Sequence, residues 1–250
     1  MLTAFLQSLI LRKLYIAPIR DLDNMFPFIK LMLRTFGYAE GQDIPEMHLL
    51  NFWLAPQYLE QITMQRLREE FQKQKPFPHL SLQHFFHEAR LEELKKAIDE
   101  EKFTQKTSDL FSFKQTKDFF NCKNKVIKAF YDFLRSKAFM VYMEYLTGLK
   151  FKRNQVDLAA TLYEDTDFLL PHDDRLEKRK LAFMTYLSNL RKRDGGTLVL
   201  YNEKGKAVKK VLPLANTFCF FAVSKHSLHE IEEVVGKVQR LTVGGWYHAH

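Results

Sequence analysis

Cysteine is scarce in this sequence, with only Cys122 and Cys219 among 250 residues. Two cysteines in a chain of this length do not make the disulfide framework of a small secreted protein. Cys219 also lies inside an apolar, strand-like run at 217–222. We therefore expect both cysteines to be reduced, structural thiols of a cytosolic protein.

Long apolar runs are absent as well. No segment approaches the ~20 apolar residues that a membrane-spanning helix needs. Residues 1–10 are apolar, but the basic pair Arg12 and Lys13 follows them instead of preceding them, and no small-residue cleavage site is evident. A secretory signal is therefore not indicated. These absences predict a soluble, cytoplasmic protein without a membrane partner.

The sequence also has no internal repeats and no low-complexity segments, and 250 residues suffice for one substantial domain with an appendage. The formal net charge of +8 favours acidic partners or a ribonucleoprotein setting. The basic residues are spread over several short clusters, so direct nucleic-acid binding has no specific support. Nothing in the sequence indicates an oligomeric state.

The hydrophobic pattern changes character near residue 75. Before that point the apolar spacing is helical, with segments at 2–10 and 22–33 and a third at 45–73 that Pro56 bends or breaks. Residues 80–149 predict a strand and then amphipathic helices at 86–101 and 125–146, with a polar loop at 107–116 between them. Gly148 is a stop signal for the second of these helices.

After residue 149 the apolar period becomes two, the period of a half-buried strand. Eight strands are predicted, at 156–163, 168–172, 181–188, 197–201, 208–212, 217–223, 228–235 and 240–247. We predict an α+β chain with a mainly β core: a double-stranded β-helix (jelly roll) buttressed by helices. A helical extension of unknown role spans 1–75, and the main domain spans 76–250, with helical support at 85–149 and the jelly roll at 150–250.

An H-x-D motif lies in the segment 171–175, where His172 and Asp174 are two residues apart. Such residues point to the same side of a strand, so both can converge on one metal ion. His229 is the better candidate for a third ligand, because a strand position holds a side chain rigidly. His226 lies in a turn and is interpreted as a surface residue. Two histidines and one carboxylate are the donor set of non-haem Fe(II) oxygenases.

Arg240 opens the last predicted strand and shares one face with Thr242, Gly244 and Trp246. An inward-facing arginine needs an anion, because burying an unpaired charge is costly. An internal Asp or Glu is one such partner. In combination with the H-x-D motif, the far carboxylate of a 2-oxo acid is the better one, since a guanidinium presents a fixed fork to it.

Tyr163 and Tyr186 each lie near the end of an apolar strand. Their phenol groups can add hydrogen-bond donors to the pocket of Arg240. The residues alone leave the alternative open that both are core tyrosines with satisfied hydroxyl groups.

Several segments of the chain resemble one known family. These are 162–177 around the H-x-D motif, 181–187, 195–201 and 240–248. They are similar to the ribosomal-protein prolyl 3-hydroxylases, a group within the Fe(II)/2-oxoglutarate prolyl hydroxylases. The similarity reaches upstream to 109–118 and covers about 77–250. It does not extend to the helical extension, nor to the second, non-catalytic jelly roll of eukaryotic members.

The resemblance implies a role for each candidate residue. His172, Asp174 and His229 become the iron ligands, and Arg240 forms a salt bridge with the C5 carboxylate of 2-oxoglutarate. The remaining assignments are Tyr186 as a hydrogen-bonding neighbour of that carboxylate, Tyr163 and Thr242 facing the cosubstrate pocket, Trp246 as a wall beside the metal, and 111–116 flanking the substrate entrance.

The implied activity is an Fe(II)- and 2-oxoglutarate-dependent dioxygenase that uses O2, with ascorbate as a candidate reductant, to hydroxylate a prolyl residue in a protein. The first candidate substrate is a small-subunit ribosomal protein. One alternative keeps the chemistry but acts on a free amino acid, another protein or another small molecule. An alternative of a different class is a catalytically idle jelly roll that only binds, although the complete set of three ligands and Arg240 argues against it.

Overall fold

The computed structural model of the chain describes Gly37 and residues 45–176 and 178–250. The helices predicted at 2–10 and 22–33 lie outside these residues. Residues Glu46–His250 form one compact unit, so the helical segment that begins at residue 45 folds together with the sheet. Among the described residues, no helix has both the length and the apolar character needed to cross a membrane.

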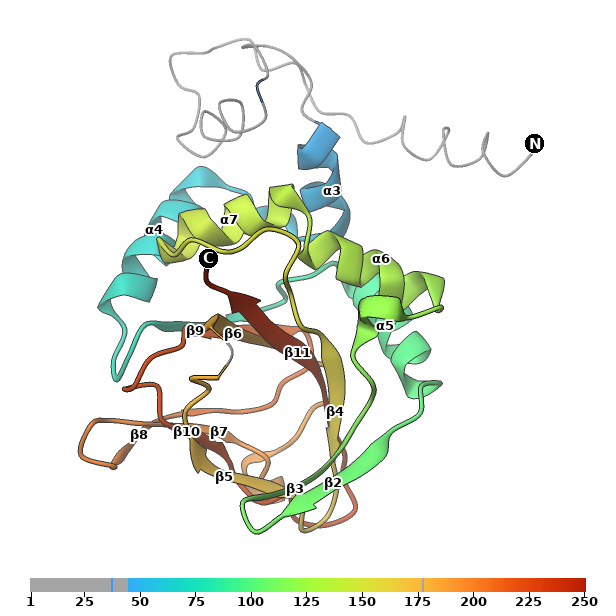
Figure 1. The fold of residues 1–250 in the computed structure, drawn as a ribbon, viewed down its shortest axis with the longest axis vertical. Coiled ribbons are helices and arrows are strands. Elements are labelled where there is room, and N and C mark those ends of the chain that lie inside the picture. Colours follow the sequence, from blue (N-terminus) through green and yellow to red (C-terminus); the bar gives the residue numbers. More distant parts are fainter. Residues whose placement is uncertain (1–36, 38–44, 177) are drawn as a thin grey trace. The chain divides into compact units, whose positions relative to one another are not determined.

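An antiparallel sheet of 11 strands curls into a roll (Figure 1). The strands are β1 (His79–Gln83), β2 (Thr104–Ser108), β3 (Phe111–Gln115), β4 (Ala159–Tyr163), β5 (Phe168–His172), β6 (Arg179–Tyr186), β7 (Leu198–Tyr201), β8 (Ala207–Val211), β9 (Thr217–Ala222), β10 (His229–Ile231) and β11 (Arg240–His248). Their order is β1-β9-β6-β11-β4-β3-β5-β10-β7-β8, with β2 paired to β3. All eight strands predicted after residue 149 are present, and the predicted double-stranded β-helix is confirmed.

Helices cover the side of the roll formed by β6, β9 and β11 (Figure 1). In the described residues they are α3 (Pro45–Trp53), α4 (Gln61–Lys73), α5 (Glu88–Asp99), α6 (Lys125–Leu134) and α7 (Lys137–Thr147). Strand β9 shows why the sheet is apolar on both faces. Phe218 and Phe220 stack on aromatic residues of the helical layer, while Cys219 and Phe221 point to the core inside the roll.

Two local predictions need correction. The helix predicted at 125–146 is two helices, because Arg135 ends α6 and the Ser136 side chain accepts a hydrogen bond from the Phe139 amide to begin α7. The polar loop predicted at 107–116 is the β2–β3 hairpin. Strand β2 is exposed along its whole length, so its sequence lacks the apolar alternation by which a strand is recognised. The predicted break near Pro56 and the αL helix end at Gly148 are both observed.

Candidate functional site

The interior of the roll holds a cavity of about 130 Å³. Strands β3, β4, β5, β6, β10 and β11 contribute to its lining, so it lies between the two halves of the sheet. All the candidate residues of the H-x-D motif, His229 and Arg240 line this one cavity. The sequence separates these side chains by up to 68 residues, and the fold brings them together.

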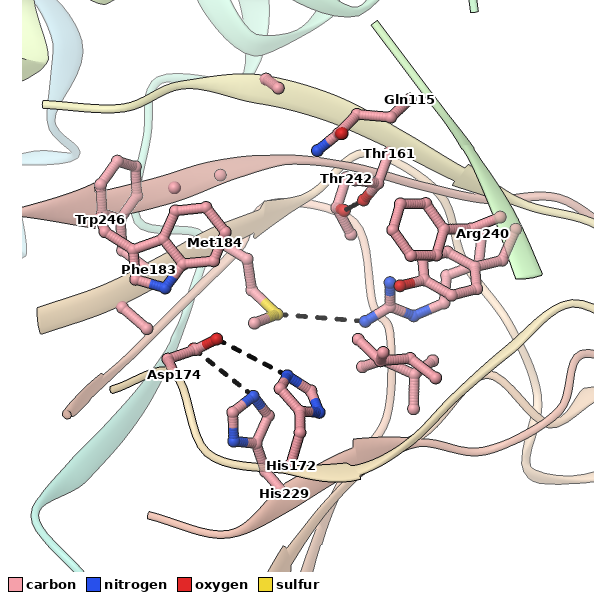
Figure 2. Close-up of a pocket in the computed structure, with 18 residues that line it drawn as sticks. Gln115, Thr161, His172, Asp174, Phe183, Met184, His229, Arg240, Thr242 and Trp246 are labelled. Carbon is pink, nitrogen blue, oxygen red and sulfur yellow. Dashed lines mark hydrogen bonds and ion pairs between the residues drawn. The ribbon is translucent and has the colours of Figure 1, made fainter. Parts of the chain in front are cut away.

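Sheet register places the two candidate histidines face to face. His172 ends β5, His229 begins β10, and the two residues are direct partners in the antiparallel ladder. Their rings lie 4.2 Å apart, centroid to centroid. Asp174 follows β5 by two residues and reaches back between them (Figure 2). Its carboxylate oxygens lie 3.6 Å from the Nε2 atom of each histidine.

Backbone carbonyl groups fix the orientation of both imidazole rings. The Nδ1 atom of His172 lies 2.9 Å from the Leu170 carbonyl oxygen, and that of His229 lies 2.8 Å from the Ser227 carbonyl oxygen. A carbonyl oxygen can only accept, so Nδ1 carries the proton and donates it in each case. The Nε2 lone pairs are thereby directed at Asp174, which is the outer-shell arrangement of metal-binding histidines.

Electrostatics keep the cluster in the protonation states that a metal needs. Burial alone opposes ionisation of Asp174, but the hydrogen bond from His172 and the nearby His229 lower the pKa of its carboxyl group to about 2. Burial lowers the pKa of His229 to about 4, so this ring is neutral at pH 7. Burial also acts against protonation of His172, yet its contacts with Asp174 outweigh burial and raise its pKa. A bound cation would replace the proton that Asp174 favours there.

Arg240 lies at the other end of the cavity and is 1 % exposed. Its Nε donates to the Gly196 carbonyl oxygen over 2.7 Å, and its guanidinium lies 5.1 Å from the ring centroids of both Tyr163 and Tyr186. Among the described residues, no carboxylate lies within ion-pair distance of it. The internal Asp or Glu that the sequence left open as its partner is therefore not found there.

The other predicted pocket residues lie along the same walls. Burial raises the pKa of Tyr163 and Tyr186, so both phenols stay neutral donors. Tyr186 Oη is buried and has no hydrogen-bond partner within the described part of the chain. Thr242 lines the cavity and its hydroxyl lies 2.6 Å from that of Thr161. Trp246 borders the Asp174 end (Figure 2), and its buried Nε1 also lacks a partner among the described residues.

The structure separates the alternative histidine from the site. His226 is exposed and its Nδ1 lies 3.0 Å from Glu203, as expected of a surface residue. It also brings in side chains that the sequence reasoning did not select, namely Met184 and Gln115 in the cavity and Arg179, which stacks 3.6 Å from the ring of Trp246. Strand parity could have found Met184, because it lies two residues before Tyr186 on the same face of β6.

The donor set fits a non-haem Fe(II) centre. Within the described residues, His172, Asp174 and His229 are the one group of three or more histidine, cysteine or acidic side chains that could hold a metal ion, and their ligand atoms lie within 4.8 Å of one another. Two neutral imidazoles and one carboxylate suit Fe(II) and leave coordination positions open. The buried guanidinium and the unpartnered phenol of Tyr186 form an anion site across the cavity. The fold and site together define the class of a metal-dependent oxygenase that uses a 2-oxo acid.

Comparisons with known proteins agree with this class. Residues 158–248 match the family described as the 2OG-Fe(II) oxygenase superfamily. The chain is 40 % identical over 182 residues to prolyl 3-hydroxylase OGFOD1 of Xenopus laevis, and 31 % identical over 165 residues to prolyl 3-hydroxylase sudestada1 of Drosophila melanogaster. These matches cover 69 % and 60 % of this chain, but 35 % and 30 % of the two relatives. The chain therefore spans about a third of the length of the curated relatives it matches.

Solved structures share the fold. A prolyl-4-hydroxylase of Pseudomonas putida superposes with a TM-score of 0.61 at 16 % identity, covering 74 % of this chain and 99 % of that one. A prolyl hydroxylase of Trichoplax adhaerens, solved with a hypoxia-inducible-factor peptide, gives 0.60 at 16 % identity, covering 77 % and 95 %. The chain carries a domain of the 2OG-Fe(II) oxygenase superfamily, and its similarity to the prolyl 3-hydroxylases, predicted from its motifs, is confirmed.

Proposed function

We propose that this protein is an Fe(II)- and 2-oxoglutarate-dependent dioxygenase that hydroxylates a prolyl residue in a protein. The observation that carries the proposal is one cavity with two complementary ends. At one end three side chains present a facial donor set, and at the other Arg240 is buried without a carboxylate partner among the described residues. A dicarboxylate that is also a 2-oxo acid satisfies both ends at once.

In this proposal each residue has a distinct role. His172, Asp174 and His229 hold Fe(II), and the proton on each Nδ1 keeps the imidazole rings turned towards the metal. With iron and cosubstrate bound, oxidative decarboxylation of 2-oxoglutarate by O2 to succinate and CO2 supplies the oxidising power for C–H hydroxylation. Arg240 and the phenol of Tyr186 bind the far carboxylate.

Other side chains shape and dry the cavity. Phe113, Leu169 and Ile231 give it apolar walls, which exclude water from the reacting centre. Trp246 forms the wall beside the metal, and Tyr163 and Thr242 face the cosubstrate. The β2–β3 hairpin contributes Phe113 and Gln115 to the lining, which supports the assignment of residues 111–116 to the substrate entrance.

The substrate assignment rests on relatives and on charge. The relatives at 31–40 % identity carry prolyl 3-hydroxylase names. We take a small-subunit ribosomal protein as the first substrate to test, and the net charge of +8 suits a ribonucleoprotein setting. Ascorbate as the reductant and the cytoplasm as the compartment belong to the same proposal.

The test measures succinate and peptide mass in one reaction. Purified protein is incubated anaerobically with Fe(II) and 2-oxoglutarate, O2 is admitted, and turnover is followed with and without a proline-containing ribosomal peptide. Peptide-dependent succinate with a gain of one oxygen atom on the peptide is the expected result. Succinate without peptide modification would move the activity to another substrate, and absence of turnover would favour the binding module.

Adjacent residues provide matched controls for the metal site. Asp174→Ala should abolish iron binding, whereas Asp173→Ala should retain it, because Asp173 pairs with Arg175 and is not part of the cluster. His229→Ala and His226→Ala form a second such pair. Equal iron binding by Asp174→Ala and the unmodified protein would rule out the assigned triad.

A further inference from the structure

Met184 occupies the middle of the inner face of β6. In the ladder with β11, Ala182 pairs with Trp246, Met184 with Gly244, and Tyr186 with Thr242. Alternate residues of a strand point to the same side, so the three β6 side chains share the inner face. The first lies beside the metal end of the cavity and the last beside Arg240. Met184 therefore lies between the two ends.

The thioether of Met184 is exposed to the cavity. It lines the same cavity as the His172–Asp174–His229 cluster, and its Sδ lies 4.0 Å from Nη2 of Arg240. Figure 2 shows the sulfur directed into the space between that cluster and the guanidinium. Met64, Met140 and Met143 are instead packed among core residues, with at most 1 % exposure. Met184 is thus a soft, oxidisable group placed where dioxygen would be activated.

We propose that Met184 is a self-oxidation site of this protein. When no prolyl substrate fills the cavity, the thioether receives the oxygen atom that the substrate C–H bond would otherwise receive. This inference rests on the proposed function, because it uses the same iron, 2-oxoglutarate and O2.

The reaction balances without a further reagent. One 2-oxoglutarate, one O2 and one thioether give succinate, CO2 and a sulfoxide. The O–O bond breaks, one oxygen atom enters the new carboxylate of succinate, and the other forms the S–O bond. The four electrons that reduce O2 come in equal parts from the oxidative decarboxylation and from a lone pair of the sulfur, so no external reductant is consumed.

The product would act on the cosubstrate site. A sulfoxide oxygen is a hydrogen-bond acceptor, whereas a thioether is a weak one. At Met184 this oxygen lies within reach of the Arg240 guanidinium, and it competes there with the far carboxylate of 2-oxoglutarate. Oxidation therefore lowers cosubstrate affinity and makes turnover without substrate self-limiting.

The experiment follows the oxidation residue by residue. The full chain is incubated with Fe(II), 2-oxoglutarate, ¹⁸O₂ and catalase but no peptide, and it is then digested and mapped by mass spectrometry. Met184 should gain one labelled oxygen atom in proportion to the succinate formed. Met47, which is half-buried on α3 and does not line the cavity, is the internal control for diffusible oxidants. Binding of 2-oxoglutarate to the oxidised protein, measured by calorimetry with Mn(II), should weaken about tenfold.

Variants separate the possible outcomes. Met184→Leu, which keeps the volume and removes the sulfur, should slow the loss of activity during preincubation without peptide. Met184 that stays unmodified while succinate accumulates, or that oxidises no faster than Met47, overturns the inference and leaves the proposed function standing. Turnover that occurs only with peptide has the same meaning. If no succinate forms under any condition and 2-oxoglutarate does not bind, the proposed function falls and the inference falls with it.

Discussion

Replacing Arg240 by methionine should change cosubstrate affinity and fold stability very differently. Methionine keeps much of the length of the side chain but removes the charge. In the intact protein the guanidinium is buried, with a hydrogen bond to the Gly196 carbonyl oxygen and contacts to two tyrosine rings. It has no counter-ion among the described residues, so most of its charge is available to a ligand.

The magnitude for the ligand follows from charge-assisted hydrogen bonds. Each such bond contributes about 1.5–3 kcal/mol, and a guanidinium binds a carboxylate through two of them. A loss of about 3–4 kcal/mol corresponds to a 10²–10³-fold weaker binding of 2-oxoglutarate, at about 1.4 kcal/mol for each factor of ten. Iron binding should persist, because Arg240 belongs to the opposite end of the cavity.

The magnitude for the fold is small because its contributions nearly cancel. The hydrogen bond to Gly196 contributes about 2 kcal/mol and each aromatic contact about 1 kcal/mol. Desolvation of an unpaired charge costs several kcal/mol. The free energy of unfolding of cosubstrate-free Arg240→Met should therefore differ from that of the unmodified protein by less than about 2 kcal/mol.

Calorimetric titration with Mn(II) and 2-oxoglutarate, together with urea unfolding, measures both quantities. Unaltered 2-oxoglutarate binding would refute the assignment of Arg240 to the cosubstrate. A loss of stability above about 4 kcal/mol would show that an anionic partner exists in the folded protein, because breaking a buried pair has a cost of that size. The two readouts thus test separate parts of the reasoning.

Further predictions concern the phenol, the close backbone contact and acid stability. Tyr186→Phe should weaken 2-oxoglutarate binding about tenfold without loss of stability, because its buried hydroxyl lacks a partner in the described structure; unaltered binding in calorimetry would refute this. Gly245→Ala should cost about 3 kcal/mol or more in chemical unfolding, since a Cβ there would lie 1.9 Å from the Asp157 carbonyl oxygen. Gly205→Ala, whose Cβ would meet nothing within 4 Å, serves as its control. Burial lowers the pKa of His79 below 6.5, so the unfolded chain binds the proton more readily and stability falls as pH drops below about 6.5. Unfolding of His79→Gln at pH 5 and pH 7.5 should show a smaller difference than in the unmodified protein.

Local sequence pattern predicted most of the strands because alternation of apolar and polar residues directly reflects two faces. The run at 168–172 was predicted with the observed bounds, and the strand at 240–247 differs from β11 by one residue. The same parity put His172 and Asp174 on one side and aligned Arg240 with Trp246. Pattern failed at β2, which has no buried face, and at 125–146, where a side-chain cap and not periodicity divides the helix.

The sequence by itself determined which residues could ligate iron and which arginine could meet a carboxylate, because residue type and strand parity are local properties. Tertiary structure decided that they share one cavity. The register of β5 with β10 sets His172 against His229, and the backbone carbonyls of Leu170 and Ser227 choose the tautomer of each ring. Only the pairing of β6 with β11 put the sulfur of Met184 in contact with the guanidinium. Such contacts depend on which strands become neighbours, and that is settled by packing of the whole chain.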